Sequence, residues 1–282
     1  MIDPSFTLWL LAVALGTSAL GGMLGMASGI FIVPVLTTFG HVEIHQAVGA
    51  SLVSVIACSC GGAAPFLRNR LTNVRLAVVL EVATTLGALT GVLLAGMLPV
   101  SFLYFLFAVI LFVSAQQMLI RRRVQMIAGD EGCRWASALN LHASYPDREL
   151  GHDVAYRIAR LPVGMGLMYG AGLVSALLGI GSGVLKIPAM DTGMRLPIKV
   201  SSGTSNFMIG VTAAASAVAY FMEGRIVPSV AAPVAIGSFA GAVLGAHMLI
   251  RVPSGKLRVF FVAVLVLLGI QMLLSGAGVH VF

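Results

Sequence analysis

The feature that most constrains the fold is the recurrence of long apolar stretches along the chain. A helix of about 20 apolar residues crosses a hydrocarbon core of about 30 Å, and in lipid a helix satisfies its own backbone hydrogen bonds. Hydrophobic residues make up 59% of the chain and charged residues 10%, which leaves no room for an ordinary soluble domain. The sequence therefore predicts an all-α integral membrane protein. The apolar stretches cover residues 5–40, 46–66, 76–98, 100–120, 163–193, 199–222, 226–250 and 257–275.

A polar gap divides these stretches into four and four. Residues 121–162 hold five of the ten acidic residues and seven of the seventeen basic ones. We expect a first membrane repeat at 1–120, a cytoplasmic linker at 121–162 and a second membrane repeat at 163–282. Basic residues collect at this gap and at segment ends, so the positive-inside rule places those loops in the cytoplasm. Both termini then lie outside if the first segment of each half enters the membrane and returns. This predicts a multi-pass protein of a bacterial-type inner cell membrane.

The two halves are an internal repeat. At an offset of 154 residues the glycines and the proline of the first apolar stretch superpose on those of the fifth. The superposed pairs are Gly25 on Gly179, Gly29 on Gly183 and Pro34 on Pro188. At an offset of 150, Gly87 and Gly91 meet Gly237 and Gly241, a spacing that lets membrane helices approach closely.

The first segment of each repeat must be interrupted. Residues 163–193 would form a straight helix of about 45 Å, too long for one ordinary span and too short for two. The glycine cluster followed by Pro188 predicts a broken or re-entrant segment, typical of a transport site. If each first segment enters and returns, each half of four to five segments crosses an odd number of times. The halves are then inverted, as in alternating-access carriers. A kink without function and a single span, with the N-terminus inside, remain open.

Lys186 is the only basic residue well inside an apolar stretch. A cation within a membrane usually faces a cavity and marks an ion path. The equivalent position in the first repeat is Ile32, so the second half is chemically specialised. The alternative is a lysine that snorkels to the cytoplasmic interface.

A cluster of hydroxyl and amide side chains begins the next apolar stretch. The free N–H groups and the positive end of a helix there also favour an anion. Together with Lys186, the candidates for substrate contact are Ser201, Ser202, Thr204, Ser205, Asn206, Ser51, Gly29 and Gly183. The alternative is that these hydroxyls bond to the preceding helical turn.

Other chemistries find little support. No Gly-x-x-x-x-Gly-Lys-Ser/Thr loop occurs, and no nucleophile–base pair or metal cluster stands out, so we expect no catalytic residues, no metal and no cofactor. The net charge of +7 follows from membrane topology, and we expect no nucleic-acid partner. Glu81 lies inside a predicted helix, where it is either a proton relay or half of an interfacial ion pair with a basic neighbour.

The glycine clusters and the polar stretch resemble the twin signatures of the sulfite exporter TauE/SafE family. The segments that carry the resemblance are Gly179-Ile-Gly-Ser-Gly-Val-Leu-Lys-Ile-Pro-Ala189, Gly203-Thr-Ser-Asn-Phe-Met-Ile-Gly-Val-Thr212, Gly25-Met-Ala-Ser-Gly-Ile-Phe-Ile-Val-Pro34 and Ala47-Val-Gly-Ala-Ser51. The resemblance implies a gradient-driven multi-pass carrier that exports sulfur-containing oxyanions such as sulfite or organosulfonates. Lys186 and Thr204-Ser205-Asn206 match the motif positions.

The expected partners are a small anionic substrate and the lipid bilayer. A coupling proton or cation and a homodimer are left open by the sequence. So are three alternatives: import rather than export, another small anion or carboxylate as substrate, and a membrane scaffold that transports nothing.

Overall fold

The computed structural model describes residues 4–24, 28–119, 133–147, 152–248 and 254–277. The first half contains helices α1 (Pro4–Leu24), α2 (Gly29–Thr38), α3 (Ile44–Arg68), α4 (Val74–Ala95) and α5 (Val100–Leu119). The second half contains α7 (Leu161–Leu178), α8 (Gly183–Pro188), the π-helical turn η1 (Ala189–Gly193), α9 (Ile198–Met222), α10 (Pro228–Met248) and α11 (Ser254–Gly276). Between the halves lie α6 (Arg134–Ala138) and the antiparallel strands β1 (Ala143–Asp147) and β2 (His152–Tyr156).

The described helices include six that are long and apolar enough to cross a membrane: α1, α3, α4, α7, α9 and α10. Large apolar side chains on the outside of these helices, such as Val78, Leu93 and Val218, are exposed, as expected for a surface that faces lipid. The prediction of an all-α membrane architecture is confirmed for the helical body. The hairpin of β1 and β2 was not predicted.

The broken segment of the second half is confirmed. Helix α7 ends at Leu178, and Gly179 and Gly181 adopt φ values of +64° and +66°, which L-residues with side chains avoid. The chain then returns to the end of the bundle where α7 begins. The backbone N–H of Ala159, before α7, donates to the carbonyl oxygen of Met194, after η1, at 3.3 Å. The residues that precede α7 and those that follow η1 therefore lie side by side.

The first half has a similar arrangement. Helices α1 and α2 are separate, and residues 25–27, which include the predicted break at Gly25, lie outside the described residues. A Cβ atom built on Gly40, just after α2, would lie 3.3 Å from the ring of Trp9 in α1. The end of α2 thus returns close to the first turns of α1.

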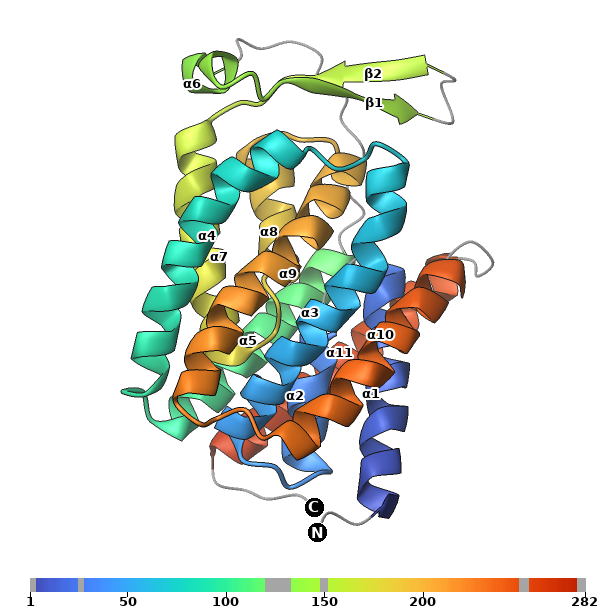
Figure 1. Cartoon of the computed structure of the whole chain (residues 1–282), viewed down its shortest axis with the longest axis vertical. Coiled ribbons are helices and arrows are strands. Elements are labelled where there is room, and N and C mark those ends of the chain that lie inside the picture. The colour runs from blue at the N-terminus through green and yellow to red at the C-terminus, as the bar shows by residue number, and fades with distance from the viewer. Residues whose placement is uncertain (1–3, 25–27, 120–132, 148–151, 249–253, 278–282) are drawn as a thin grey trace.

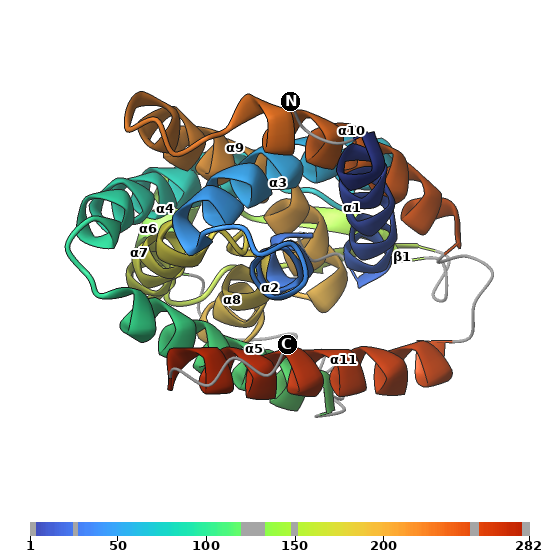
Figure 2. The same cartoon turned by 90° about the horizontal axis from the view of Figure 1, so that it is seen from below.

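The two halves are packed into each other rather than side by side. Helix α1 packs against α10, α4 against α7, α3 against α9, and α5 against α11. The glycine stripes lie in two of these contacts: Gly87 and Gly91 face the backbone of α7, and Gly237 and Gly241 face the backbone of α1. Figure 2 shows α5 and α11 as an outer layer along one side of the bundle.

The hairpin and α6 lie at one end of the bundle, and both termini lie at the other (Figure 1). Asn73 fixes this arrangement. Its Oδ1 accepts a hydrogen bond from the N–H of Leu76 at the start of α4, while its Nδ2 donates to the carbonyl oxygen of Leu141 and to the hydroxyl of Tyr156, both at 2.9 Å. The described part of 121–162 is therefore docked onto the α3–α4 turn.

Candidate functional site

The centre of the candidate site is a buried ion pair between the two halves. Lys186 on α8 is 0% exposed, and its Nζ lies 3.4 Å from Oε2 of Glu81 on α4. Thr212 on α9 bridges the pair: its Oγ1 accepts a hydrogen bond from Lys186 Nζ and donates one to Glu81 Oε1, each at 2.5 Å. Three helices thus contribute one polar group each to this cluster.

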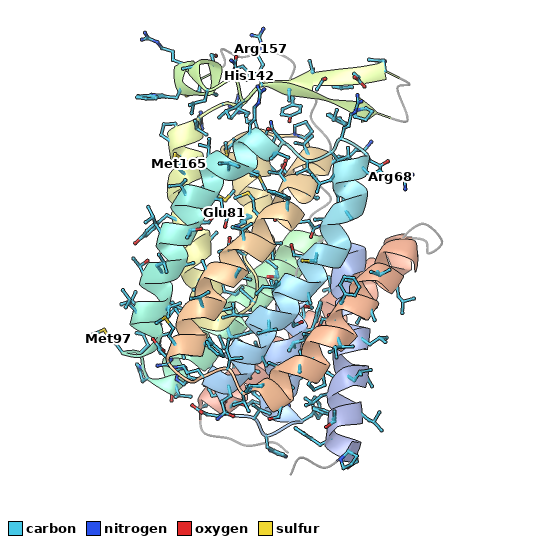
Figure 3. The ribbon with its side chains drawn as sticks, viewed as in Figure 1. Arg68, Glu81, Met97, His142, Arg157 and Met165 are labelled. Carbon is cyan, nitrogen blue, oxygen red and sulfur yellow. The ribbon has the colours of Figure 1, made fainter. Side chains whose placement is uncertain are left out.

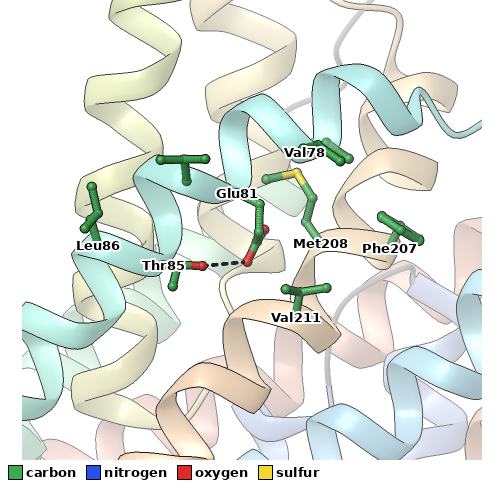
Figure 4. A pocket seen from close by; sticks show the side chains of 9 residues that line it. Val78, Glu81, Thr85, Leu86, Phe207, Met208 and Val211 are labelled. Atoms are coloured by element: carbon green, nitrogen blue, oxygen red, sulfur yellow. Dashed lines mark hydrogen bonds between the residues drawn. The ribbon is translucent and has the colours of Figure 1, made fainter.

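Glu81 also faces outward, where it forms the polar floor of a groove between α4 and α9. The cavity has a volume of about 500 Å³, and Figure 4 shows Glu81 among the apolar side chains that line it. Thr85 Oγ1 donates a hydrogen bond of 3.4 Å to Glu81 Oε1 on this side. Glu81 is 12% exposed and Lys186 is 0% exposed, so only the acid of the pair reaches the surroundings. The lining residues are Ala77, Val78, Glu81, Val82, Thr85, Leu86, Phe207, Met208 and Val211.

The corresponding positions in the other half carry no charge. At the repeat offsets, Lys186, Thr212 and Glu81 correspond to Ile32, Cys58 and Ala231, all of which are buried. The shared architecture therefore does not require the ion pair. Because a buried salt bridge costs desolvation energy that apolar residues avoid, its presence in one half alone indicates a role other than stability.

A second group of predicted residues meets where the two breaks cross. Ser51 Oγ donates to the carbonyl oxygen of Gly179 at 2.7 Å. A Cβ atom on Gly29 would lie 2.7 Å from Ser51 Oγ and 2.9 Å from the carbonyl carbon of Ile180, so the start of α2 abuts the break of the second half. A Cβ on Gly183 would lie 3.6 Å from Ser205 Oγ, which brings α9 to the same region.

Among the described residues, three serine hydroxyls at the break and in the first turns of α9 have no hydrogen-bond partner. The Oγ atoms of Ser182, Ser201 and Ser205 are buried and make no hydrogen bond within the described part of the chain. An unsatisfied buried hydroxyl costs free energy, so each such group in a native protein calls for an explanation, of which a role in function is one.

The remaining predicted residues have structural contacts. Thr204 Oγ1 accepts a hydrogen bond from the N–H of Asn73 at 3.1 Å, and the backbone oxygen of Asn206 accepts one from Ser59 at 2.8 Å. Both bonds join α9 to the first half rather than to Lys186. Ser202 is partly exposed at the start of α9. The structure thus places Lys186, Gly183, Ser205, Ser51 and Gly29 around the break, and uses Thr204 and Asn206 to join the halves.

The partner of Glu81 differs from the basic neighbour that the sequence suggested. Arg75, six residues earlier, donates instead to the backbone oxygen of Asn140 at 3.4 Å. Glu81 pairs with Lys186, which lies 105 residues away in the chain. One signal was present: a carboxylate and an ammonium buried in different apolar segments are expected to pair with each other.

Comparison with known proteins agrees with this architecture. The family model for the sulfite exporter TauE/SafE family matches residues 10–272. The chain is 21% identical to the probable membrane transporter protein YunE of Bacillus subtilis over 95% of this chain and 97% of that protein. It is 25% identical to the probable membrane transporter protein YdhB of the same organism over 84% and 88% of the two chains. No solved structure matches it significantly. The chain is a multi-pass membrane transporter and belongs to the sulfite exporter TauE/SafE family.

Proposed function

We infer that this transporter is a secondary carrier that exports small sulfur-containing oxyanions, such as sulfite or organosulfonates, by alternating access. The observation that carries the proposal is Lys186, a fully buried ammonium one turn into α8, the helix that begins at Gly183 after the break. A buried cation is costly unless an anion compensates it. A substrate anion next to Lys186 would provide that compensation during transport.

The surroundings of Lys186 suit an oxyanion that must also be released. Ser182 and Ser205 flank Gly183 and carry unpartnered hydroxyls, while Thr212 contacts the ammonium itself. Neutral donors hold an oxyanion without the strength of several charges. A sulfonate or sulfite offers three oxygens to such a set, because each oxygen accepts hydrogen bonds.

The arrangement of the halves supports alternating access. Helix α1 starts near the termini, whereas α7 follows the hairpin at the opposite end (Figure 1), so equivalent helices run in opposite directions along the bundle. Such an arrangement supports inverted repeats, in which one half rocks against the other around a central site. The crossing at Gly29 and Gly179 would be the point that such rocking moves.

The test is binding of anions by the purified protein and by a matched pair of variants. We expect a sulfonate or sulfite, at about 100 times its Kd, to stabilise the wild type by about 2.7 kcal/mol, and carboxylates to do so less. Lys186→Met should abolish the effect, whereas Ile32→Met, at the equivalent position of the first half, should retain it. Because Lys186→Met leaves Glu81 without its partner, Lys186→Met/Glu81→Gln serves as a second, charge-free variant.

Stabilisation by carboxylates alone would replace the sulfur oxyanion with another class of anion. Equal losses in the lysine and isoleucine variants would mean that packing, and not charge, controls binding. Counterflow of labelled substrate in proteoliposomes then measures transport itself. Comparing substrate uptake by right-side-out and inside-out membrane vesicles gives the direction of transport.

A further inference from the structure

The ammonium of Lys186 already has an anion beside it, and that anion is part of the protein. Glu81 Oε2 lies 3.4 Å from Lys186 Nζ, and Thr212 holds both groups with hydrogen bonds. An anionic substrate that pairs with Lys186 needs the position that the Glu81 carboxylate occupies. This step rests on the proposed function, because it takes Lys186 as the place where substrate binds.

Glu81 is the acid that pairs with Lys186 in the described parts of the packed elements. Helices α7 and α9 pack against α4, and α8 with η1 packs against α9. Tyr169 and Tyr220 donate their hydroxyls to Thr90 and to the backbone of Ala176, and Arg75 bonds Asn140 at the hairpin end. The charged or titratable side chains on these elements are Arg75, Glu81, Tyr169, Lys186, Asp191, Lys199 and Tyr220.

A carboxylate that loses its cation in an apolar interior becomes neutral by binding a proton, because an isolated buried charge is costly. We propose that Glu81 is a tethered competitor of the substrate for Lys186, and that each substrate anion that binds Lys186 is accompanied by one proton taken up by Glu81. The difference in exposure supports this assignment. Glu81 is 12% exposed at the floor of the α4–α9 groove, whereas Lys186 is 0% exposed, so the acid is the less enclosed partner of the pair.

The charges balance in this exchange. Before binding, the site holds one ammonium and one carboxylate, and afterwards it holds one ammonium, one substrate monoanion and one carboxylic acid. The proton comes from water and attaches to a carboxylate oxygen of Glu81, and no other covalent bond changes. The site is neutral in both states, so a monoanion crosses without net charge. Net flux then follows the combined gradients of anion and proton, and export requires an excess of the anion inside.

The test measures the affinity for methanesulfonate, whose charge stays constant in neutral and mildly acidic solution, by calorimetry between about pH 5.5 and about pH 8. We expect wild-type affinity to rise by up to about tenfold for each unit of falling pH, as linkage to one proton requires. Glu81→Gln should bind at least about tenfold more tightly than wild type at the upper pH, because its competitor is gone. Glu223→Gln is the same change at the end of α9, away from the site, and this variant should bind the sulfonate as the wild type does.

Lys186 itself can lose a proton once Glu81 is neutral, which would add a second pH dependence. An arginine stays charged throughout this range, so a second pair of variants isolates Glu81. Lys186→Arg should keep the tighter binding at low pH, and Lys186→Arg/Glu81→Gln should bind with an affinity that hardly changes with pH. Proton uptake, measured as the buffer dependence of the binding enthalpy, should be close to one per anion in the first variant and near zero in the second.

The outcomes separate this inference from the proposed function. If wild type binds the sulfonate and Glu81→Gln binds it equally or less tightly at every pH, the competitor role of Glu81 is wrong while the anion site stands. If neither the wild type nor any variant binds an oxyanion, the proposed function fails and this inference with it.

Discussion

Lys186 and Glu81 carry opposite charges. Each charge is costly to bury alone and is acceptable when the two are paired. Their contact is 3.4 Å long and joins helices from the two halves of the chain. In the loop between α9 and α10, Arg225 and Glu223 form a shorter pair, with Nε and Oε2 2.8 Å apart. Their side chains are 24% and 38% exposed. Burial rather than distance should decide which pair matters for stability.

A double-mutant cycle tests this expectation. Lys186→Met and Glu81→Gln should each cost about 3–5 kcal/mol, because each leaves an uncompensated buried group. The double variant should cost much less than the sum of the two, since no charge remains in the apolar interior. Apparent unfolding temperatures of the four detergent-purified proteins measure the coupling.

The same cycle on Arg225→Gln and Glu223→Gln provides the control. Each of these changes should cost no more than about 1 kcal/mol, because water screens an exposed pair. Strictly additive losses at Lys186 and Glu81 would show that the two side chains are not coupled.

The sequence identified one partner of the buried pair but not the other. Lys186 stood out because it is a lone cation in an apolar stretch, which composition alone reveals. The assignment of Glu81 as the partner needed two tertiary contacts, the packing of α4 against α9 and of α8 against α9. The sequence alone does not show which helices pack together or which of their residues face each other. Residues 105 positions apart carry no local periodicity that could place them opposite each other.

The crossing of the two broken segments depends on the absence of side chains. The start of α2 lies against the turn at Gly179, and the first residue of α2, Gly29, would direct a Cβ atom at the backbone of Gly179 and Ile180. Backbone atoms in a turn with positive φ cannot move aside as the end of a flexible side chain can. Close approach of the two halves therefore requires glycine at this position.

Gly29→Ala should consequently destabilise the protein by about 1–3 kcal/mol or more, the usual cost of overpacking a filled interior. Gly170→Ala is the matched control, because Gly170 lies in the middle of α7 and a Cβ there meets nothing within 4 Å. That variant should be neutral or more stable by up to about 1 kcal/mol, since alanine favours the helix. Thermal unfolding and the yield of monodisperse protein measure both effects. Equal behaviour of the two alanine variants would mean that the halves do not meet at Gly29.

At the level of elements, the bilayer restricts the structures that a segment can adopt, and this allows helices to be predicted from the sequence. The apolar stretches, the break at Gly179 and the small-residue contacts at Gly87 and Gly237 were all predicted, because length, glycine and proline act locally. The fold of the linker was not predicted. The linker is held by hydrogen bonds from Asn73 to the backbone of Leu141 and the hydroxyl of Tyr156. No short sequence pattern predicts such tertiary contacts. Burial raises the pKa of Tyr156, so its phenol stays neutral and this docking persists well above neutral pH.

At the scale of the whole molecule, charge is distributed unevenly between the two ends. Figure 3 shows Arg68 and Arg157 at the hairpin end and Met97 at the opposite end. The loop of the opposite end that joins α9 to α10 carries Arg225, but this cation is paired with Glu223. The positive-inside rule therefore favours a cytoplasmic hairpin, with the termini outside. The same orientation would put the start of α1 and the start of α7 on opposite sides of the membrane.

Cysteine labelling in intact cells tests this orientation. Cys133 precedes α6 at the hairpin end, and hydrogen bonding from the backbone of Trp135 lowers its pKa, which increases the thiolate fraction that reacts with a maleimide. With Cys58 and Cys60 replaced by alanine, an impermeant maleimide should label Cys133 only after the cells are permeabilised. In the same background with Cys133→Ala, Ser5→Cys at the exposed start of α1 should be labelled without permeabilisation. Labelling of both sites from one side would require an even number of crossings between them. The two halves would then have the same orientation, and alternating access by inverted repeats would be wrong.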